Sequence, residues 1–151
     1  MSAAVLLQIR NGEQRARRAE PFRLFFTLTN QCGRKIQVYI PYRVSIQGEV
    51  DLPFHLRMGP ITPLKEPIQG AIDRRRPLDL RKVYRVTLMP DFAISGYVEV
   101  VGKAASYTLL PVGVYQGELW YDSRPLAKLP YHEGLWLGVT NTVKFKLQVL
   151  P

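Results

Sequence analysis

Histidine and cysteine, the side chains that most often bind transition metals, are scarce in this chain. His55 and His132 are the only two histidines and Cys32 is the only cysteine among 151 residues. The histidines lie far apart in the sequence, and no pair of these residues has the spacing of a zinc-binding motif. We therefore expect no metal and no cofactor. Since one cysteine cannot form an intrachain disulfide, we also expect a reducing compartment, the cytoplasm.

Residues that serve in catalysis are present, but their spacing does not favour it. Cys32 precedes Arg34 and Lys35, whose charges would stabilise a thiolate, although a cysteine in a turn between two strands is the simpler interpretation. The carboxylates are dispersed, so no spacing selects a general acid and its partner. Glycine-rich phosphate-binding motifs do not occur in the sequence. The sequence therefore predicts a protein that is not an enzyme.

Arginine clusters are the remaining residues with a recognisable chemistry. The chain has 21 Lys and Arg against 12 Asp and Glu, a formal net charge of +9. Residues 1–85 hold 16 of the basic and 7 of the acidic side chains, and residues 86–151 hold 5 of each. Arginine pairs with carboxylates and phosphates through a planar fork of donors. The clusters are Arg15, Arg17 and Arg18; Arg34 and Lys35; Arg74, Arg75 and Arg76; and Arg81, Lys82 and Arg85.

Two kinds of partner fit such clusters. Nucleic acid would bind through phosphate neutralisation, but proteins that bind single strands also stack the bases on aromatic side chains. The clusters have few aromatic neighbours: Tyr84 lies within the last one, and Tyr39 is expected on the outward side of its strand. A protein with an acidic surface is therefore the expected partner, and non-specific nucleic-acid binding is an alternative.

Hydrophobic and polar residues alternate along most of the chain, as they do in half-buried β-strands. The alternation is clearest at residues 36–46, which predict one strand or two strands bent at Pro41, because proline cannot donate to a central ladder. It is equally clear at residues 143–149, where outward Lys144 and Lys146 favour an edge strand. Further strands are expected at residues 5–9, 22–28, 54–58, 78–88, 97–101, 107–110 and 114–121.

The connections between these strands carry most of the expected binding residues. Asn11-Gly12 predicts a hairpin turn, so that the arginines at 15, 17 and 18 would lie in the first hairpin connection. The one helical candidate, residues 13–20, has at most two turns. Residues 53–77 contain five prolines and form a long excursion, which we expect to contact a partner because long irregular connections are often functional.

Many short strands and no convincing helix predict an all-β fold. We expect one domain over residues 1–151, an antiparallel β-sandwich of about eight or nine strands, with an OB-like barrel as the alternative. The only N-terminal apolar run, residues 3–7, is too short for a secretory signal, and no window has the length of a membrane span. These features favour a soluble cytoplasmic protein.

Three motifs in the C-terminal half carry a family resemblance. They are Pro111-Val112-Gly113-Val114-Tyr115, then Trp136-Leu137-Gly138, then Val143-Lys144-Phe145, with Asn30 at the end of an early strand. Together they resemble immunoglobulin-like bacterial β-sandwich modules similar to the intracellular proteinase inhibitors. The resemblance covers about a third of the chain, and it implies an immunoglobulin-like sandwich. As an alternative function it implies a proteinase inhibitor that presents one extended loop to a protease.

The function expected from the sequence is that of a non-enzymatic protein-interaction module or assembly subunit with a basic, arginine-rich surface. Tyr131 and His132 add a polar aromatic loop before the last strand, and loops at one end of a sandwich often carry binding sites. The candidate partner-binding residues are Arg15, Arg17, Arg18, Arg74, Arg75, Arg76, Tyr131 and His132.

Overall fold

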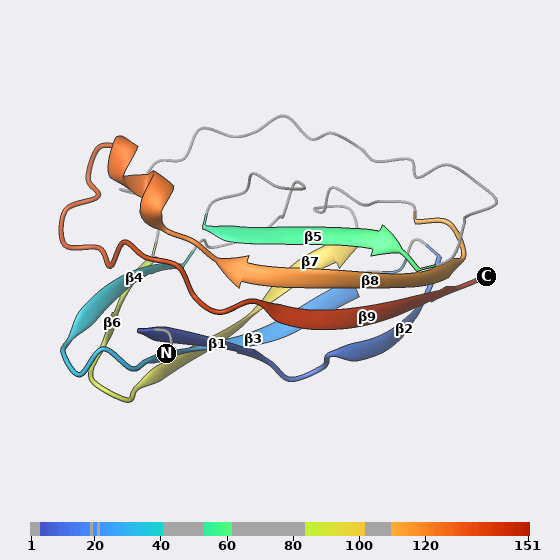
Figure 1. Cartoon of the computed structure of the whole chain (residues 1–151), viewed down its shortest axis with the longest axis horizontal. Coiled ribbons are helices and arrows are strands. Elements are labelled where there is room, and N and C mark those ends of the chain that lie inside the picture. The colour runs from blue at the N-terminus through green and yellow to red at the C-terminus, as the bar shows by residue number, and fades with distance from the viewer. Residues whose placement is uncertain (1–3, 19, 21, 41–52, 62–83, 102–109) are drawn as a thin grey trace.

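The computed structural model describes residues 4–18, 20, 22–40, 53–61, 84–101 and 110–151. These residues form an all-β structure of nine strands and one short 3-10 helix (Figure 1). The strands are β1 (Val5–Ile9), β2 (Glu13–Arg17), β3 (Phe22–Asn30), β4 (Ile36–Ile40), β5 (Phe54–Pro60), β6 (Tyr84–Leu88), β7 (Ala93–Val101), β8 (Gly113–Tyr121) and β9 (Val143–Leu150); the helix is η2 (Arg124–Lys128).

The strands form three sheets. Sheet A has the order β1-β3-β7, sheet B the order β2-β9-β8-β5, and sheet C pairs β4 with β6. Neighbouring strands are antiparallel except for β2 and β9, which are parallel, so the expectation of a purely antiparallel fold is wrong for this pair. The described sheets keep separate edges and do not close into one cylinder, which makes the barrel alternative wrong.

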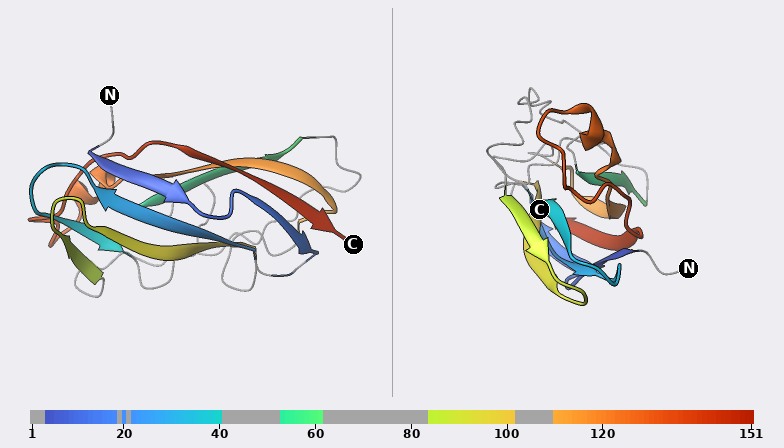
Figure 2. Two further views of the ribbon diagram at one scale, coloured as in Figure 1. Left: turned by 90° about the horizontal axis from the view of Figure 1, so that it is seen from below. Right: turned by 90° about the vertical axis from the view of Figure 1, so that its left-hand side faces the viewer.

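Sheets A and B pack face to face around one hydrophobic core (Figure 2). Every second residue of β3, from Phe22 to Leu28, is buried, as the alternation in the sequence predicts. Aromatic rings join the two layers: the ring centroid of Phe22 lies 6.0 Å from that of Phe145 on β9, and that of Phe26 lies 4.6 Å from that of Phe54 on β5. Burying each such side chain contributes about 1.5–3 kcal/mol.

The chain changes sheets between β1 and β2, and the predicted hairpin at Asn11-Gly12 is therefore wrong. β1 pairs with β3 in sheet A, whereas β2 pairs with β9 in sheet B. The Asn11 side chain completes the ladder of β3 where β1 has ended: its Oδ1 accepts from the Phe25 amide at 2.9 Å, and its Nδ2 donates to the Arg23 carbonyl at 2.7 Å. Asparagine thus serves here as a substitute for a neighbouring strand.

Residues 13–17 form a strand, so the helical candidate at 13–20 is also wrong. A helix of two turns has little stability of its own, whereas pairing with β9 satisfies backbone groups along the whole segment. The same pairing corrects the prediction for residues 143–149. β9 is not an edge strand, because β2 covers one side of it and β8 the other, and Lys144 and Lys146 point from the exposed face of sheet B.

Sheet C begins at a buried junction around Asn30, where β3 leads toward β4 and β6 leads toward β7. The fully buried Asn30 side chain donates from Nδ2 to the carbonyls of Arg34 and Leu88, at 2.7 and 2.9 Å, and accepts at Oδ1 from the Cys32 amide at 2.9 Å. Its own backbone bonds the turn before β7, where it accepts from the Asp91 amide and donates to the Phe92 carbonyl. The side chain and backbone of Asn30 therefore link the connection between β3 and β4 to the turn between β6 and β7.

The other predicted strands are confirmed over the described residues. β5, β7 and β8 cover the segments expected at 54–58, 97–101 and 114–121, and β4 and β6 cover residues 36–40 and 84–88. The predicted strand residues 41–46, 78–83 and 107–109 lie outside the described residues, as does the proline-rich excursion beyond residue 61. Within the described chain, no helix has the length and apolar character that a membrane crossing requires.

Candidate functional site

The outward face of sheet A carries two arginines stacked on two aromatic rings. The Arg10 guanidinium carbon lies 5.0 Å from the Phe25 ring centroid, and that of Arg23 lies 4.7 Å from the Tyr97 centroid. The Phe25 and Tyr97 rings lie 6.0 Å apart at an interplanar angle of 59°. We call these four residues the arginine–aromatic ladder. Tyr97 is 46% exposed, so the ladder is on the surface although its members support one another.

Strand register places the four side chains side by side. Phe25 and Tyr97 are direct cross-strand partners in the β3–β7 pair, and Arg23 is two positions before Phe25, on the same face. Arg10 follows β1, and its amide donates to the Phe25 carbonyl at 3.0 Å. Contacts of this kind contribute about 0.5–1 kcal/mol each at exposed sites. These contacts therefore favour the stacked positions of the two guanidinium groups before any partner arrives.

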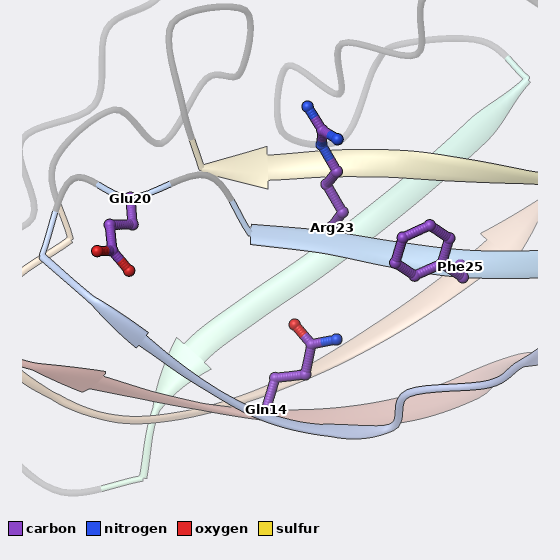
Figure 3. A pocket seen from close by; sticks show the side chains of 4 residues that line it. All are labelled: Gln14, Glu20, Arg23 and Phe25. Atoms are coloured by element: carbon purple, nitrogen blue, oxygen red, sulfur yellow. The ribbon is translucent and has the colours of Figure 1, made fainter.

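An open pocket of about 570 Å³ adjoins the ladder. Arg23 and Phe25 line it from β3, Gln14 lines it from β2, and Glu20 lines it from the connection between those strands (Figure 3). The Gln14 side chain points toward the two β3 side chains across the gap between the sheets (Figure 3). A cation, a carboxylate, an amide and an aromatic ring thus surround one depression, which suits a polar peptide better than a wholly apolar ligand.

The arginines predicted at the N-terminal cluster lie on and just after β2, the strand whose Gln14 lines this pocket. Arg15 and Arg17 are exposed on β2, and Arg18 follows the strand, with its amide donating to the Leu150 carbonyl at 2.9 Å. Arg15 and Arg17 are strand residues, and none of the three arginines lies in a hairpin connection as predicted. Because side chains alternate along a strand, Arg15 and Arg17 point from the face of β2 opposite to Gln14, on the outward face of sheet B, so only the strand itself, and not this pair of side chains, adjoins the pocket.

Tyr131 and His132 lie at the other end of the molecule. They follow η2, whereas the C-terminal end of β2 lies near the chain's C-terminus, at the opposite end of the long axis (Figure 1, Figure 2). Arg85 bonds the carbonyls of Tyr131 and of Glu133, the latter at 2.6 Å, and His132 Nδ1 lies 2.7 Å from the Leu129 carbonyl. The structure therefore does not bring this loop together with the β2 arginines. Arg74, Arg75 and Arg76 lie outside the described residues.

The outward face of sheet B has a second aromatic stack, and the charges beside this stack partly offset one another. His55 and Trp120 stack at 5.5 Å, and the Arg57 guanidinium lies 5.6 Å from the Trp120 centroid. Across the strands, Glu118 has Lys144 on one side and Arg57 on the other. Opposite charges at such positions attract each other, which leaves less net charge to recruit a partner. We therefore regard sheet A as the stronger candidate surface.

Among the described residues, no group of three or more His, Cys, Asp or Glu side chains that could hold a metal ion occurs. The Cys32 sulfur lies 3.3 Å from the Ala4 carbonyl, and the side chain packs against the core, as expected of a turn cysteine. Arg124 binds Asp122 through both carboxylate oxygens, at 2.9 and 2.8 Å, and thereby lowers the pKa of that carboxyl group.

Tyr39 is buried, and the expectation that it is an outward stacking platform is wrong. Only 2% of it is exposed, and it packs with Leu126 and Leu135 because η2 and the segment after it cover this side of β4. The Tyr121 hydroxyl donates to the Tyr39 carbonyl at 2.8 Å. Burial raises the pKa of both phenols above the usual value of 10.

The raised pKa of Tyr121 predicts a loss of stability in alkali. The folded state retains the phenol proton more strongly than the unfolded chain does, so the stabilisation is complete below pH 10 and is lost as the pH rises above it. Tyr121 contributes a fall in the free energy of unfolding of about 1.4 kcal/mol per pH unit in that range. Tyr121→Phe should reduce this slope. Urea unfolding at intervals between about pH 9 and 11.5 measures it, and an unchanged slope would contradict the assignment.

No protein-family model, no curated protein and no solved structure matches the chain at a significant level. The candidate site therefore stands on its residues alone: an exposed arginine–aromatic ladder, an adjoining polar pocket, and an arginine-bearing strand next to both.

Proposed function

We propose that this chain is a non-enzymatic protein-interaction module that binds an acidic surface of a partner protein through its arginine-bearing side. The arginine–aromatic ladder is the observation that carries the proposal. Binding energy at interfaces concentrates in aromatic and arginine residues, and the ladder presents two of each on a rigid sheet. Arg15, Arg17 and Arg18 add positive charge on and after β2, the strand next to the pocket. Arg74, Arg75 and Arg76 stay in the proposal from their sequence alone.

An immunoglobulin-like sandwich is the fold that we propose for the module. Its main support is Tyr115, whose buried hydroxyl donates to the Pro111 carbonyl at 2.6 Å. Such a bond, from a tyrosine near the start of a strand back to a residue just upstream, is the tyrosine corner of immunoglobulin-like domains. The Pro-x-Gly-x-Tyr motif supplies both partners of this bond. Domains of this kind often serve as scaffolds for binding surfaces.

An acidic protein is a better partner for the ladder than a single-stranded nucleic acid. Base stacking needs an accessible ring face, but the guanidinium groups of Arg10 and Arg23 already lie over the faces of Phe25 and Tyr97. A carboxylate, in contrast, approaches the edge of a guanidinium and leaves the stack intact. The ladder as it stands therefore favours an anion that binds the guanidinium edge, such as a carboxylate, over a stacked base.

Photo-crosslinking at the ladder tests the proposal. A benzophenone amino acid replaces Tyr97 in cells of the source organism, and a matched variant carries it at Gln116, an exposed position on sheet B. The Tyr97 variant should give a discrete adduct that protease destroys and nuclease does not, and Arg10→Glu with Arg23→Glu should reduce it at least tenfold. A nuclease-sensitive adduct, or equal adducts from both positions, would overturn the proposal.

A further inference from the structure

Among the residues that the structure describes, β2 is an outer strand of sheet B, and the edge opposite β9 has backbone groups directed away from the sheet. The Gly12 carbonyl accepts from the Lys146 amide at 2.7 Å, and the Arg18 amide donates to the Leu150 carbonyl at 2.9 Å, so residues 12 and 18 face β9. Because these directions alternate along a strand, Gln14 and Ala16 also face β9. The amides and carbonyls of Glu13, Arg15 and Arg17 therefore point outward from the edge.

Only part of this edge is open. At the C-terminal end of β2, Glu20 satisfies both outward backbone groups of Arg17. The Glu20 carboxylate accepts from the Arg17 amide at 3.2 Å, and the Glu20 amide donates to the Arg17 carbonyl at 3.0 Å. Glu13 and Arg15 have no such partner among the residues that the structure describes. The open stretch therefore runs from Glu13 to Arg15, next to Gln14 and the pocket that it lines.

We propose that the Glu13–Arg15 edge of β2 is a docking site for an extended acidic segment of the partner protein, which adds a strand to sheet B. An added strand would bond the outward amides and carbonyls of β2, as in other β-augmented complexes. Alternate side chains of that strand would face the exposed Arg15 and Arg17 on one side and the pocket on the other. This inference rests on the proposed function and names the form in which the acidic partner binds.

Charge selects this occupant over a second copy of the chain. Two β2 edges paired antiparallel about Arg15 would set the two Arg15 side chains directly opposite each other, and like charges at such positions are destabilising. The same pairing would need the backbone groups of Arg17, which Glu20 already binds. A strand with glutamates on one face has neither problem, because it places carboxylates opposite the arginines.

The test uses the full chain and the acetylated, amidated peptide Val-Glu-Val-Glu-Val-Glu-Val. We expect saturable binding, with hydrogen exchange of the Glu13 and Arg15 amides slowed at least tenfold. A first control peptide is N-methylated at alternate residues, which removes the N–H groups that would donate to β2, and it should bind at least tenfold more weakly. A second control peptide with lysine in place of glutamate should be weakened to the same extent. Equal binding of the N-methylated peptide, no protection of the two amides, or no saturable binding would overturn the inference.

A pair of variants isolates the backbone contribution. Arg15→Pro removes the outward N–H but none of the hydrogen bonds between β2 and β9. Because edge strands tolerate proline, this variant should fold and should bind the peptide at least tenfold more weakly. Arg15→Thr removes the same charge but keeps the N–H, and should retain more binding than Arg15→Pro. Equal losses of peptide affinity in the two variants would contradict strand addition. The proposal would also be contradicted if the native chain self-associates in sedimentation experiments and Arg15→Pro abolishes this self-association, because a second copy would then occupy the edge. If Arg15→Pro leaves the Tyr97 adduct in place, the proposed function stands and only the edge site fails.

Discussion

Asn30→Ala is expected to lower the free energy of unfolding by about 3–5 kcal/mol, because it leaves three backbone groups around a fully buried side chain without partners. The Asn30 side chain is fully buried and bonds the Arg34 carbonyl, the Leu88 carbonyl and the Cys32 amide. Each orphaned group costs about 1–3 kcal/mol in a site that water does not reach. A loss of this size is a large share of the 5–15 kcal/mol that stabilises a typical domain.

Asn11→Ala is the matched control for this prediction. Asn11 also bonds two backbone groups that a neighbouring strand would otherwise satisfy, the Phe25 amide and the Arg23 carbonyl, but it does so near the surface. Water can replace its bonds, so the expected loss is about 1 kcal/mol. Urea unfolding of both variants compares them. Equal losses would mean that burial of the Asn30 junction contributes little.

The alternation of apolar and polar residues was sufficient to locate most strands, because burial on one face imposes a period of two. In β3, and in β8 from Tyr115 onward, every second residue is buried, as this period requires. The alternation did not predict β2. Its sequence, Glu-Gln-Arg-Ala-Arg, contains Ala16 as its only apolar residue, and its strand conformation depends on pairing with β9, more than a hundred residues away.

The position of β9 in its sheet could not be read from its own residues. Lys144 and Lys146 face solvent, and this is equally true of an edge strand and of a central strand in a sheet with one exposed face. Only the location of β2 decides between the two. Pairing across sheets is a property of the whole chain, and local pattern does not encode it.

The candidate site was missed for a similar reason, although one signal was present. The sequence-based prediction selected runs of neighbouring arginines. The ladder, in contrast, consists of residues from three separate segments: Arg10, Arg23 with Phe25, and Tyr97. Phe25 occupies an outward position in a strand whose inward residues from Phe22 to Leu28 are all apolar. A large aromatic ring at such a position needs a partner on the surface, and this is the clue that would have identified the face.

Gly117→Ala is expected to lower the free energy of unfolding by about 2–3 kcal/mol. Gly117 lies on the inward face of β8, directly across from Phe145 on β9. A Cβ at this position would lie 2.6 Å from Cε1 and 2.8 Å from Cε2 of the Phe145 ring, and closer still to Cζ. The ring is 2% exposed and packs against Phe22, so it has little room to move. Overpacking of this kind typically costs about 1–3 kcal/mol.

Two further variants separate this steric effect from the general effect of losing a glycine. Gly59→Ala on β5 is the control, because a Cβ there has no atom within 4 Å, and a change within about 1 kcal/mol is expected. In the second, Phe145→Leu makes space beside residue 117, so Gly117→Ala should cost at least 1 kcal/mol less in that background than in the native chain. Thermal or urea unfolding of the four proteins completes the cycle. If the changes in the free energy of unfolding of the two single variants simply add in the double variant, the Phe145 ring does not lie over Gly117. That result would contradict the pairing of β8 with β9 described above.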